Sequence, residues 1–184
     1  MKTKGFTLIE LLVVIAIVAV LATAVVVILN PAQLVRQGRD STRISDLSAI
    51  HSALALYLSD VVSPVFTATT TCTRATSTDN PTGFDAAVSS SLTTTGGAGW
   101  VNVNLGSISG GSPLSRLPLD PTNDSTNKYC FKIASSTLLT YELDANMESG
   151  KYANGGASDV ESNNKDGGNS DTWYEVGNDP GLDL

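Results

Sequence analysis

The pattern of apolar and polar positions divides the chain into two parts. Residues 11–29 include no charged side chain, and Thr23 is the only polar residue among them. A helix rises about 1.5 Å per residue, so this run reaches roughly the 30 Å thickness of a bilayer core. Backbone groups in lipid must hydrogen-bond within the segment, so the run predicts a membrane-spanning helix. Glu10, at its apolar start, is a candidate functional residue because a charge there is costly.

The helical pattern continues beyond the apolar run. Apolar residues recur at helical spacing on one face, namely Leu34, Ile44, Leu47, Ile50, Leu54 and Tyr57. Charged residues three or four positions apart are expected on the opposite face, namely Arg36, Asp40, Arg43 and Asp46. We therefore expect one helix over residues 6–58, apolar on all sides in its first half and amphipathic in its second. Pro31 and Gly38 weaken it, so a kink or local melting is expected over residues 30–38.

The remaining residues predict a small β-rich region after a long connection. Of the 33 residues 63–95, 16 are Ser or Thr, so this stretch can bury little core and reads as a connecting region. Alternating apolar residues predict strands at 100–105, 129–133, 139–143 and 173–176, the middle two joined as a hairpin by residues 134–137. An antiparallel sheet with one apolar face on the helix is the expected arrangement.

Charge and composition narrow the function classes. The formal net charge is −7, and it becomes −9 without Lys2 and Lys4. An acidic chain argues against general nucleic-acid binding through phosphates. One histidine, His51, and two cysteines leave little for a His- or Cys-based catalytic or zinc site, so no enzyme activity is expected. His51 itself is expected to be a helix-surface or packing residue.

The N-terminus carries a specific motif, the run Gly5-Phe6-Thr7-Leu8-Ile9-Glu10-Leu11-Leu12. This run resembles the processing site of type IV prepilins and of the related pseudopilins of type II secretion. The resemblance implies cleavage after Gly5 by a prepilin peptidase and methylation of the new terminal amine on Phe6 by the same enzyme. A cleaved signal peptide is the alternative, but the apolar run is long for one and has no clear cleavage site at its end.

The resemblance also implies the role of the protein and its partners. It implies a structural subunit of a type IV pilus-like filament, in which Glu10 pairs with the terminal amine of a neighbouring subunit. The partners would be the peptidase, copies of this chain and related pilins, an inner-membrane assembly platform and, before assembly, the lipid bilayer. The N-terminus would lie in the cytoplasm and the head outside it. The alternatives are a major pseudopilin of a type II secretion system and, third, a membrane-anchored binding or DNA-uptake protein.

The implied fold is α+β, a pilin-like lollipop with a long N-terminal helix on a small antiparallel sheet. Its parts would be a leader peptide (1–5), a transmembrane and filament-core helix (6–30), an amphipathic helix (31–60) and an extracytoplasmic head (61–184). Outside the cytoplasm, Cys72 and Cys130 would tend to form a disulfide that pins the connection to the sheet. Two free thiols stay open as the alternative, because the sequence does not show proximity.

Calcium is the one cofactor for which the sequence offers candidate ligands. Residues 163–171, together with Leu117, Pro118 and Asp120, loosely resemble the head of the major pseudopilins, whose C-terminal loop binds calcium. Asp166 and Asp171 would be the ligands, because carboxylate oxygens on a flexible loop suit calcium. A solvated acidic loop is the alternative.

Overall fold

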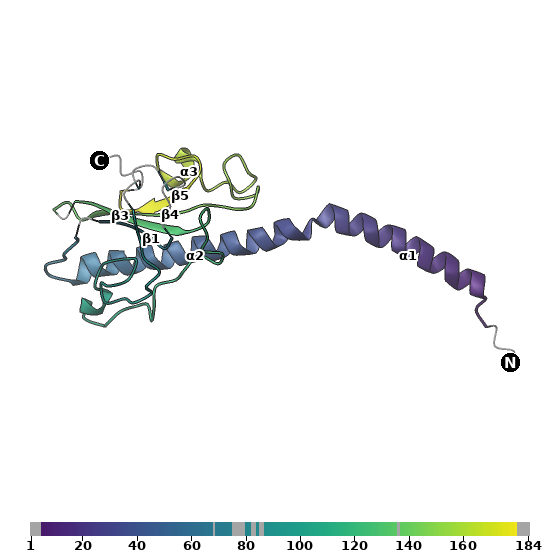
Figure 1. The fold of residues 1–184 in the computed structure, drawn as a ribbon, viewed down its shortest axis with the longest axis horizontal. Coiled ribbons are helices and arrows are strands. Elements are labelled where there is room, and N and C mark those ends of the chain that lie inside the picture. The colour runs from purple at the N-terminus through teal and green to yellow at the C-terminus, as the bar shows by residue number, and fades with distance from the viewer. Residues whose placement is uncertain are drawn as a thin grey trace. The chain divides into compact units, whose positions relative to one another are not determined.

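The structure is a computed structural model that describes residues 5–67, 69–74, 80, 81, 84, 87–135 and 137–179. Two compact units divide the chain, Met1–Arg36 and Gln37–Leu184, and each is described by itself. Four residues of the expected leader, including Lys2 and Lys4, lie outside the described residues. The fold is α+β, as the sequence predicts (Figure 1).

The N-terminal unit consists of helix α1 (Leu8–Leu29) and the first turns of helix α2 (Pro31–Asp60). Asn30 separates the helices with a left-handed backbone, φ 40° and ψ 75°. Its carbonyl accepts bonds from the amides of Gln33 (2.9 Å) and Leu34 (3.4 Å), so it caps α2. Proline suits the first position of a helix, where its missing amide hydrogen leaves no bond unmade.

The expected single helix over residues 6–58 is therefore interrupted at one residue. The break lies at Asn30, within the stretch 30–38, whereas Gly38 lies inside the continuous helix α2. By length and composition, the helical region Leu8–Asp60 has one stretch apolar enough to cross a membrane, near the N-terminus.

The second unit contains a five-stranded sheet in the order β2-β1-β3-β4-β5. The strands are β1 (Thr69–Cys72), β2 (Val88–Ser89), β3 (Tyr129–Ser135), β4 (Thr140–Ala145) and β5 (Tyr174–Gly177). The expected hairpin is confirmed as the antiparallel pair β3–β4, and the expected last strand is confirmed as β5. The sheet is mixed rather than wholly antiparallel, because β1 and β2 are parallel. Both come from the Ser/Thr-rich stretch, which was expected only to connect helix and sheet.

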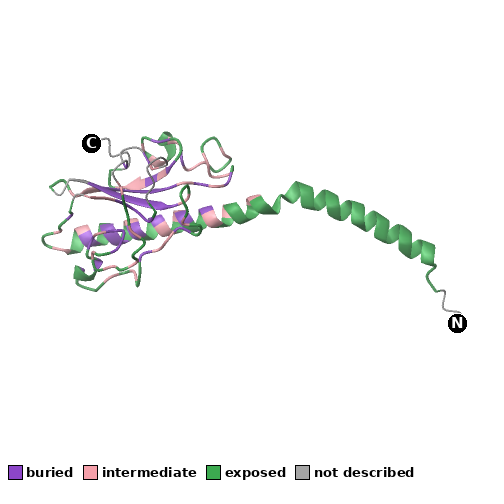
Figure 2. Ribbon diagram, in the orientation of Figure 1, coloured by how far each residue is buried: buried purple, intermediate pink, exposed green. Residues whose placement is uncertain are grey.

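One face of the sheet packs on α2 through apolar side chains (Figures 1 and 2). Buried side chains of the helix meet those of β3 and β4, among them Leu47, Ile50, Leu54, Tyr57, Tyr129, Phe131, Tyr141 and Leu143. Burying each such side chain contributes about 1.5–3 kcal/mol. The predicted stripe is confirmed from Leu47 onward. Leu34 is exposed and Ile44 only half-buried, so the buried stripe begins later than predicted.

The strand predicted at residues 100–105 is wrong. The segment is irregular and leads into a 3-10 helix, η1 (Leu105–Ser107), with a single β-bridge between Gly96 and Asn104. Its apolar residues are nevertheless buried in the core, and the indole of Trp100 donates to the carbonyl of Pro118 at 2.9 Å. The alternation thus marks inward and outward side chains of a segment that forms no ladder with any strand in the described part of the chain.

The other face of the sheet is polar, and it is also buried. Residues that alternate with the apolar ones point to it, namely Cys130, Lys132, Glu142, Asp144 and Glu175. Phe84 packs near this face, with its ring centroid 5.7 Å from the Lys132 ammonium, and the loop at Gly168 lies against Glu175. The sheet is therefore covered on both sides.

Candidate processing and assembly segment

The bond between Gly5 and Phe6 lies outside regular structure, immediately before α1. Both residues are exposed, Phe6 at 89%, and nothing lies within 4 Å of the position where a Cβ on Gly5 would stand. A peptidase needs an accessible, non-helical backbone, and glycine adopts the required conformations at little steric cost. The segment thus has the geometry of a cleavable site.

The start of α1 is fixed by a reciprocal pair of side-chain bonds between Thr7 and Glu10. Thr7 is the N-cap, and its Oγ1 accepts a bond from the Glu10 amide at 3.3 Å. The Glu10 Oε2 in turn accepts bonds from the Thr7 amide (2.8 Å) and the Thr7 hydroxyl (2.7 Å). This is a capping box, which satisfies two amides that the first turn leaves unpaired. Glu10 therefore already orders the helix next to the cleavage site.

The surface of α1 is apolar on all sides. Every residue of the helix is exposed within the structure, and the exposed side chains are almost all Val, Ile, Leu and Ala (Figure 2). Continuous apolar surface on this scale exceeds what soluble monomers leave in water, so it marks a membrane or protein contact. Thr23 is the polar exception. Its hydroxyl donates to the Ala19 carbonyl at 2.8 Å, so its hydrogen-bond donor is satisfied within the helix itself.

The second unit contains a buried ion network that the sequence interpretation missed. Arg43 and Asp120 face one another with both side chains fully buried, at 2.6 Å from Nε to Oδ2. The Arg43 guanidinium also contacts Asp40 at 2.8 Å and Glu148 at 2.6 Å. Arg39 makes a two-pronged contact with the same Glu148 carboxylate. Asp40 and Arg43 were expected on the face opposite the apolar stripe, but both are completely buried.

Asp40 links this network to the backbone of the segment after β4. Its two carboxylate oxygens accept bonds from the amides of Glu148 (2.9 Å) and Ser149 (2.8 Å). Hence α2 is joined to two distant segments, around residues 120 and 148, by charged groups. The only sequence signal was the spacing of Asp40 and Arg43, which fits an exposed helical pair equally well.

The network changes the pKa of two of its carboxylates, those of Asp120 and Glu148. Burial alone would raise the pKa of Asp120, but hydrogen bonds and the charge of Arg43 outweigh burial and lower it. Hydrogen bonds from Arg39 lower the pKa of Glu148, with Arg43 adding to the effect. Both groups are therefore held in the ionised form.

The two cysteines are brought together. Cys72 of β1 and Cys130 of β3 are directly opposite in the antiparallel pair, and a disulfide joins them across 58 residues of sequence. The bond ties the Ser/Thr-rich connection to the central strand of the sheet. His51 lies at the helix surface with its Nδ1 3.1 Å from the Tyr141 hydroxyl, as a packing residue would.

The two candidate calcium ligands lie in the loop around the short helix α3 (Asn163–Asp166) and before β5. The Asp166 carboxylate accepts bonds from the amides of Gly168 (2.9 Å) and Glu175 (3.1 Å). Asp171 accepts one from the Asn163 amide at 3.1 Å. These bonds order the loop, and calcium binding by this pair stays a prediction.

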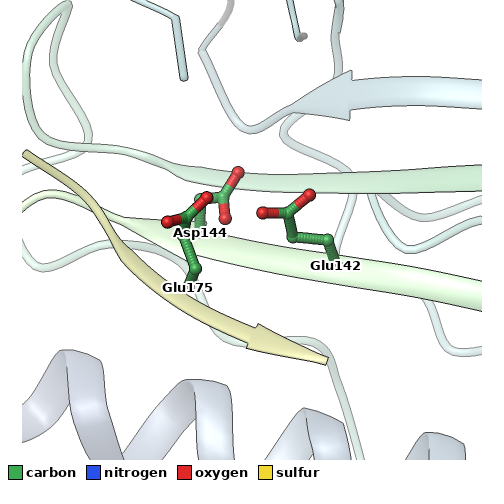
Figure 3. A group of neighbouring side chains, drawn as sticks. All are labelled: Glu142, Asp144 and Glu175. Atoms are coloured by element: carbon green, nitrogen blue, oxygen red, sulfur yellow. The ribbon is translucent and has the colours of Figure 1, made fainter. Parts of the chain in front are cut away.

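A different group of acidic side chains converges on the far face of the sheet. Glu142, Asp144 and Glu175 each place an oxygen within 4.8 Å of the other two (Figure 3). All three are buried. The sequence interpretation did not select them, although their alternation on the strands was visible.

Comparison with known proteins gives one match. The family model of the prokaryotic N-terminal methylation motif matches residues 1–26. No curated protein and no solved structure matches the chain significantly. The matched residues include the predicted cleavage site, the capping box and most of α1, and they support the type IV prepilin and pseudopilin class.

Proposed function

We propose that this chain, whose N-terminus carries the motif of type IV prepilins and pseudopilins, is a structural subunit of a type IV pilus-like filament. The observation that carries the proposal is the combination of that motif with a helix that is apolar on every side. A chain of this class is a substrate of prepilin peptidase. Cutting after Gly5 and methylating Phe6 would leave a chain of 179 residues.

The surroundings of α1 before assembly would be the lipid bilayer. Lys2 and Lys4 precede the span, and basic residues next to a span tend to stay on the cytoplasmic side. We therefore place the N-terminus in the cytoplasm and the head outside it. In the filament, α1 helices of neighbouring subunits would replace lipid around one another, and the head would form the outer surface.

In the filament, the Glu10 carboxylate would need a positively charged partner. Between Phe6 and Val35 the sequence has no Lys, Arg or His, so after cleavage the Phe6 amine is the only positive charge in the apolar segment. A carboxylate in apolar surroundings needs such a partner. Both cap bonds from Thr7 use Oε2, so Oε1 can accept the amine of a neighbouring subunit while the cap stays intact.

The test is electron microscopy of filaments sheared from the cell surface, with mass spectrometry of their main protein. Filaments built mainly from this chain would support the proposal. Surface filaments that lack it, or its recovery only as a membrane protein together with secretion components, would contradict a pilus and favour a secretion pseudopilus.

A further inference from the structure

The converging carboxylates are placed by the register of two strands. In the antiparallel pair β4–β5, Asp144 lies directly opposite Glu175. Glu142 is two residues before Asp144 on β4, so its side chain points to the same face of the sheet. Figure 3 shows the carboxylates of Asp144 and Glu175 side by side, with that of Glu142 turned toward them. The arrangement is therefore built by regular structure rather than by a loop.

Asp144 stands out within this group because no donor among the described residues reaches its carboxylate. Its side chain is completely buried, and within the described part of the chain neither carboxylate oxygen has a hydrogen-bond partner. Buried polar groups in proteins are nearly always paired, so an orphaned buried carboxylate calls for an explanation. Glu175, by contrast, accepts a bond from the Ser170 amide at 2.8 Å.

The charges near Asp144 do not balance. Lys132, directly opposite Glu142 on β3, is the nearby cation that acts on Asp144. If all three carboxylates were ionised, this one ammonium would leave two negative charges in a buried space. An uptake of positive charge would relieve this cost.

We propose that Glu142, Asp144 and Glu175 bind a divalent cation of the size of calcium between β4 and β5. Ligand sets made only of carboxylate oxygens suit hard cations. Calcium binds oxygen at about 2.3–2.6 Å, so oxygens on opposite sides of the ion are roughly 4.6–5.2 Å apart. The three oxygens lie within 4.8 Å of one another, which is close enough for one calcium ion to contact all three. Magnesium is expected to bind less well, because it demands near-ideal octahedral geometry and gives up its water reluctantly.

The loop before β5 closes over the same place. A Cβ on Gly168 would lie 1.9 Å from the Glu175 Oε2, so the loop approaches the carboxylate as closely as glycine allows. Asp166 is bonded to the Glu175 amide, which fixes the loop to the strand. The proposed ion would therefore stabilise β4, β5 and the loop together. The proposal is independent of filament assembly.

The experiment uses the full-length chain in detergent, freed of metal with a chelator. Thermal unfolding is followed by tryptophan fluorescence with calcium, magnesium or chelator, and binding is measured by calorimetry. At a calcium concentration about a hundred times the dissociation constant, the midpoint should rise by roughly 5–10 °C. Magnesium should produce a smaller rise.

Asp144→Asn is the decisive variant because it should have two opposite effects. Without metal, its midpoint should equal or exceed that of the wild type, because an orphaned buried charge is removed. Calcium affinity should fall by more than about tenfold, and the calcium-induced rise should disappear. Glu175→Gln should also lose the calcium response, and it serves in place of Asp144→Asn if that variant does not fold.

Asp179→Asn is the matched control, because it removes an exposed carboxylate that belongs to neither group of candidate calcium ligands. It should keep the calcium response. The proposal is overturned if wild-type midpoints are equal in millimolar calcium and in chelator, or if magnesium stabilises more than calcium. It is also overturned if Asp171→Asn loses the response and Asp144→Asn keeps it, since the ion would then lie on the loop.

Discussion

Arg43 and Asp120, 77 residues apart in the sequence, form a two-pronged pair with no exposed side-chain surface. Nε lies 2.6 Å from one carboxylate oxygen and Nη2 lies 3.0 Å from the other. Such planar pairing is specific to arginine, because its donors match the two oxygens of a carboxylate. The pair joins the middle of α2 to the segment before β3, where apolar packing alone would not fix the register.

Replacing Arg43 should be strongly destabilising. Arg43→Ala would leave Asp40 and Asp120 buried without a counter-charge, and breaking a buried pair in this way costs about 3–5 kcal/mol. Arg43→Lys should lose part of this stability, since a lysine cannot contact Asp120 with two donors in the planar geometry of arginine. The measurement is denaturant unfolding of the full chain in detergent. Arg116→Ala, at an exposed position of the same unit, is the control and should change stability by less than about 0.5 kcal/mol.

The pair of Arg43 and Asp120 also predicts how the folding stability changes with pH. The pKa of Asp120 is lower in the folded chain than in the unfolded chain, so its contribution is complete above the unfolded value of about 4. This contribution to stability is lost as the pH falls through the lower pKa that Asp120 has in the folded chain. Wild type and Asp120→Asn should therefore differ most in stability near pH 7, and the difference should shrink below about pH 4. A difference that does not vary with pH would refute the ionised pair.

The burial of Asp40 and Arg43 could not be predicted from the sequence, whereas several other features could. The helices, the β3–β4 hairpin and β5 were predicted, because each follows from the spacing of apolar residues within a short stretch. The prepilin-type motif was likewise readable from one short stretch, and the family model supports it, whereas cleavage after Gly5 and the assembly role of Glu10 stay predictions. Whether Arg43 faces solvent, however, depends on Asp120 and Glu148, whose position is set by the folding of distant segments.

Two further differences between the sequence predictions and the structure also arise from contacts between distant segments. Residues 100–105 have the alternation of a strand, but among the described residues their only β-pairing is the bridge between Asn104 and Gly96. Asp144 and Glu175 alternate with apolar residues, as the exposed face of a sheet would. They are buried because the segment between β4 and β5 covers that face, and its covering position is not encoded in any local period.

The disulfide is expected in exported protein. Peptide mapping without reductant should recover Cys72 linked to Cys130. Because the bond closes a separation of 58 residues, its loss should lower stability by about 4 kcal/mol on the loop-entropy estimate. Reduced wild type and a Cys72→Ala, Cys130→Ala double variant should unfold at similar denaturant concentrations. Alkylation of both thiols in unreduced exported protein would show that the bond does not form.

Glu10→Ala should permit membrane insertion and cleavage but should reduce filament yield, because the terminal amine would then enter apolar surroundings unpaired. Thr7→Ala is the matched control. It removes the hydroxyl bonds of the capping box, at a cost of about 1 kcal/mol, but keeps the carboxylate. Filament yield should remain close to that of wild type for Thr7→Ala. Equal loss in both variants would assign Glu10 to helix capping rather than to pairing between subunits.

The central claim is that the chain is cut after Gly5 and assembles through α1. Intact-mass measurement of protein from purified filaments, with sequencing of its N-terminal peptide, tests it most directly. We expect a chain of 179 residues that begins with an N-methylated Phe6. Filament protein that begins at Met1, or that begins beyond α1 as after removal of a signal peptide, would contradict it.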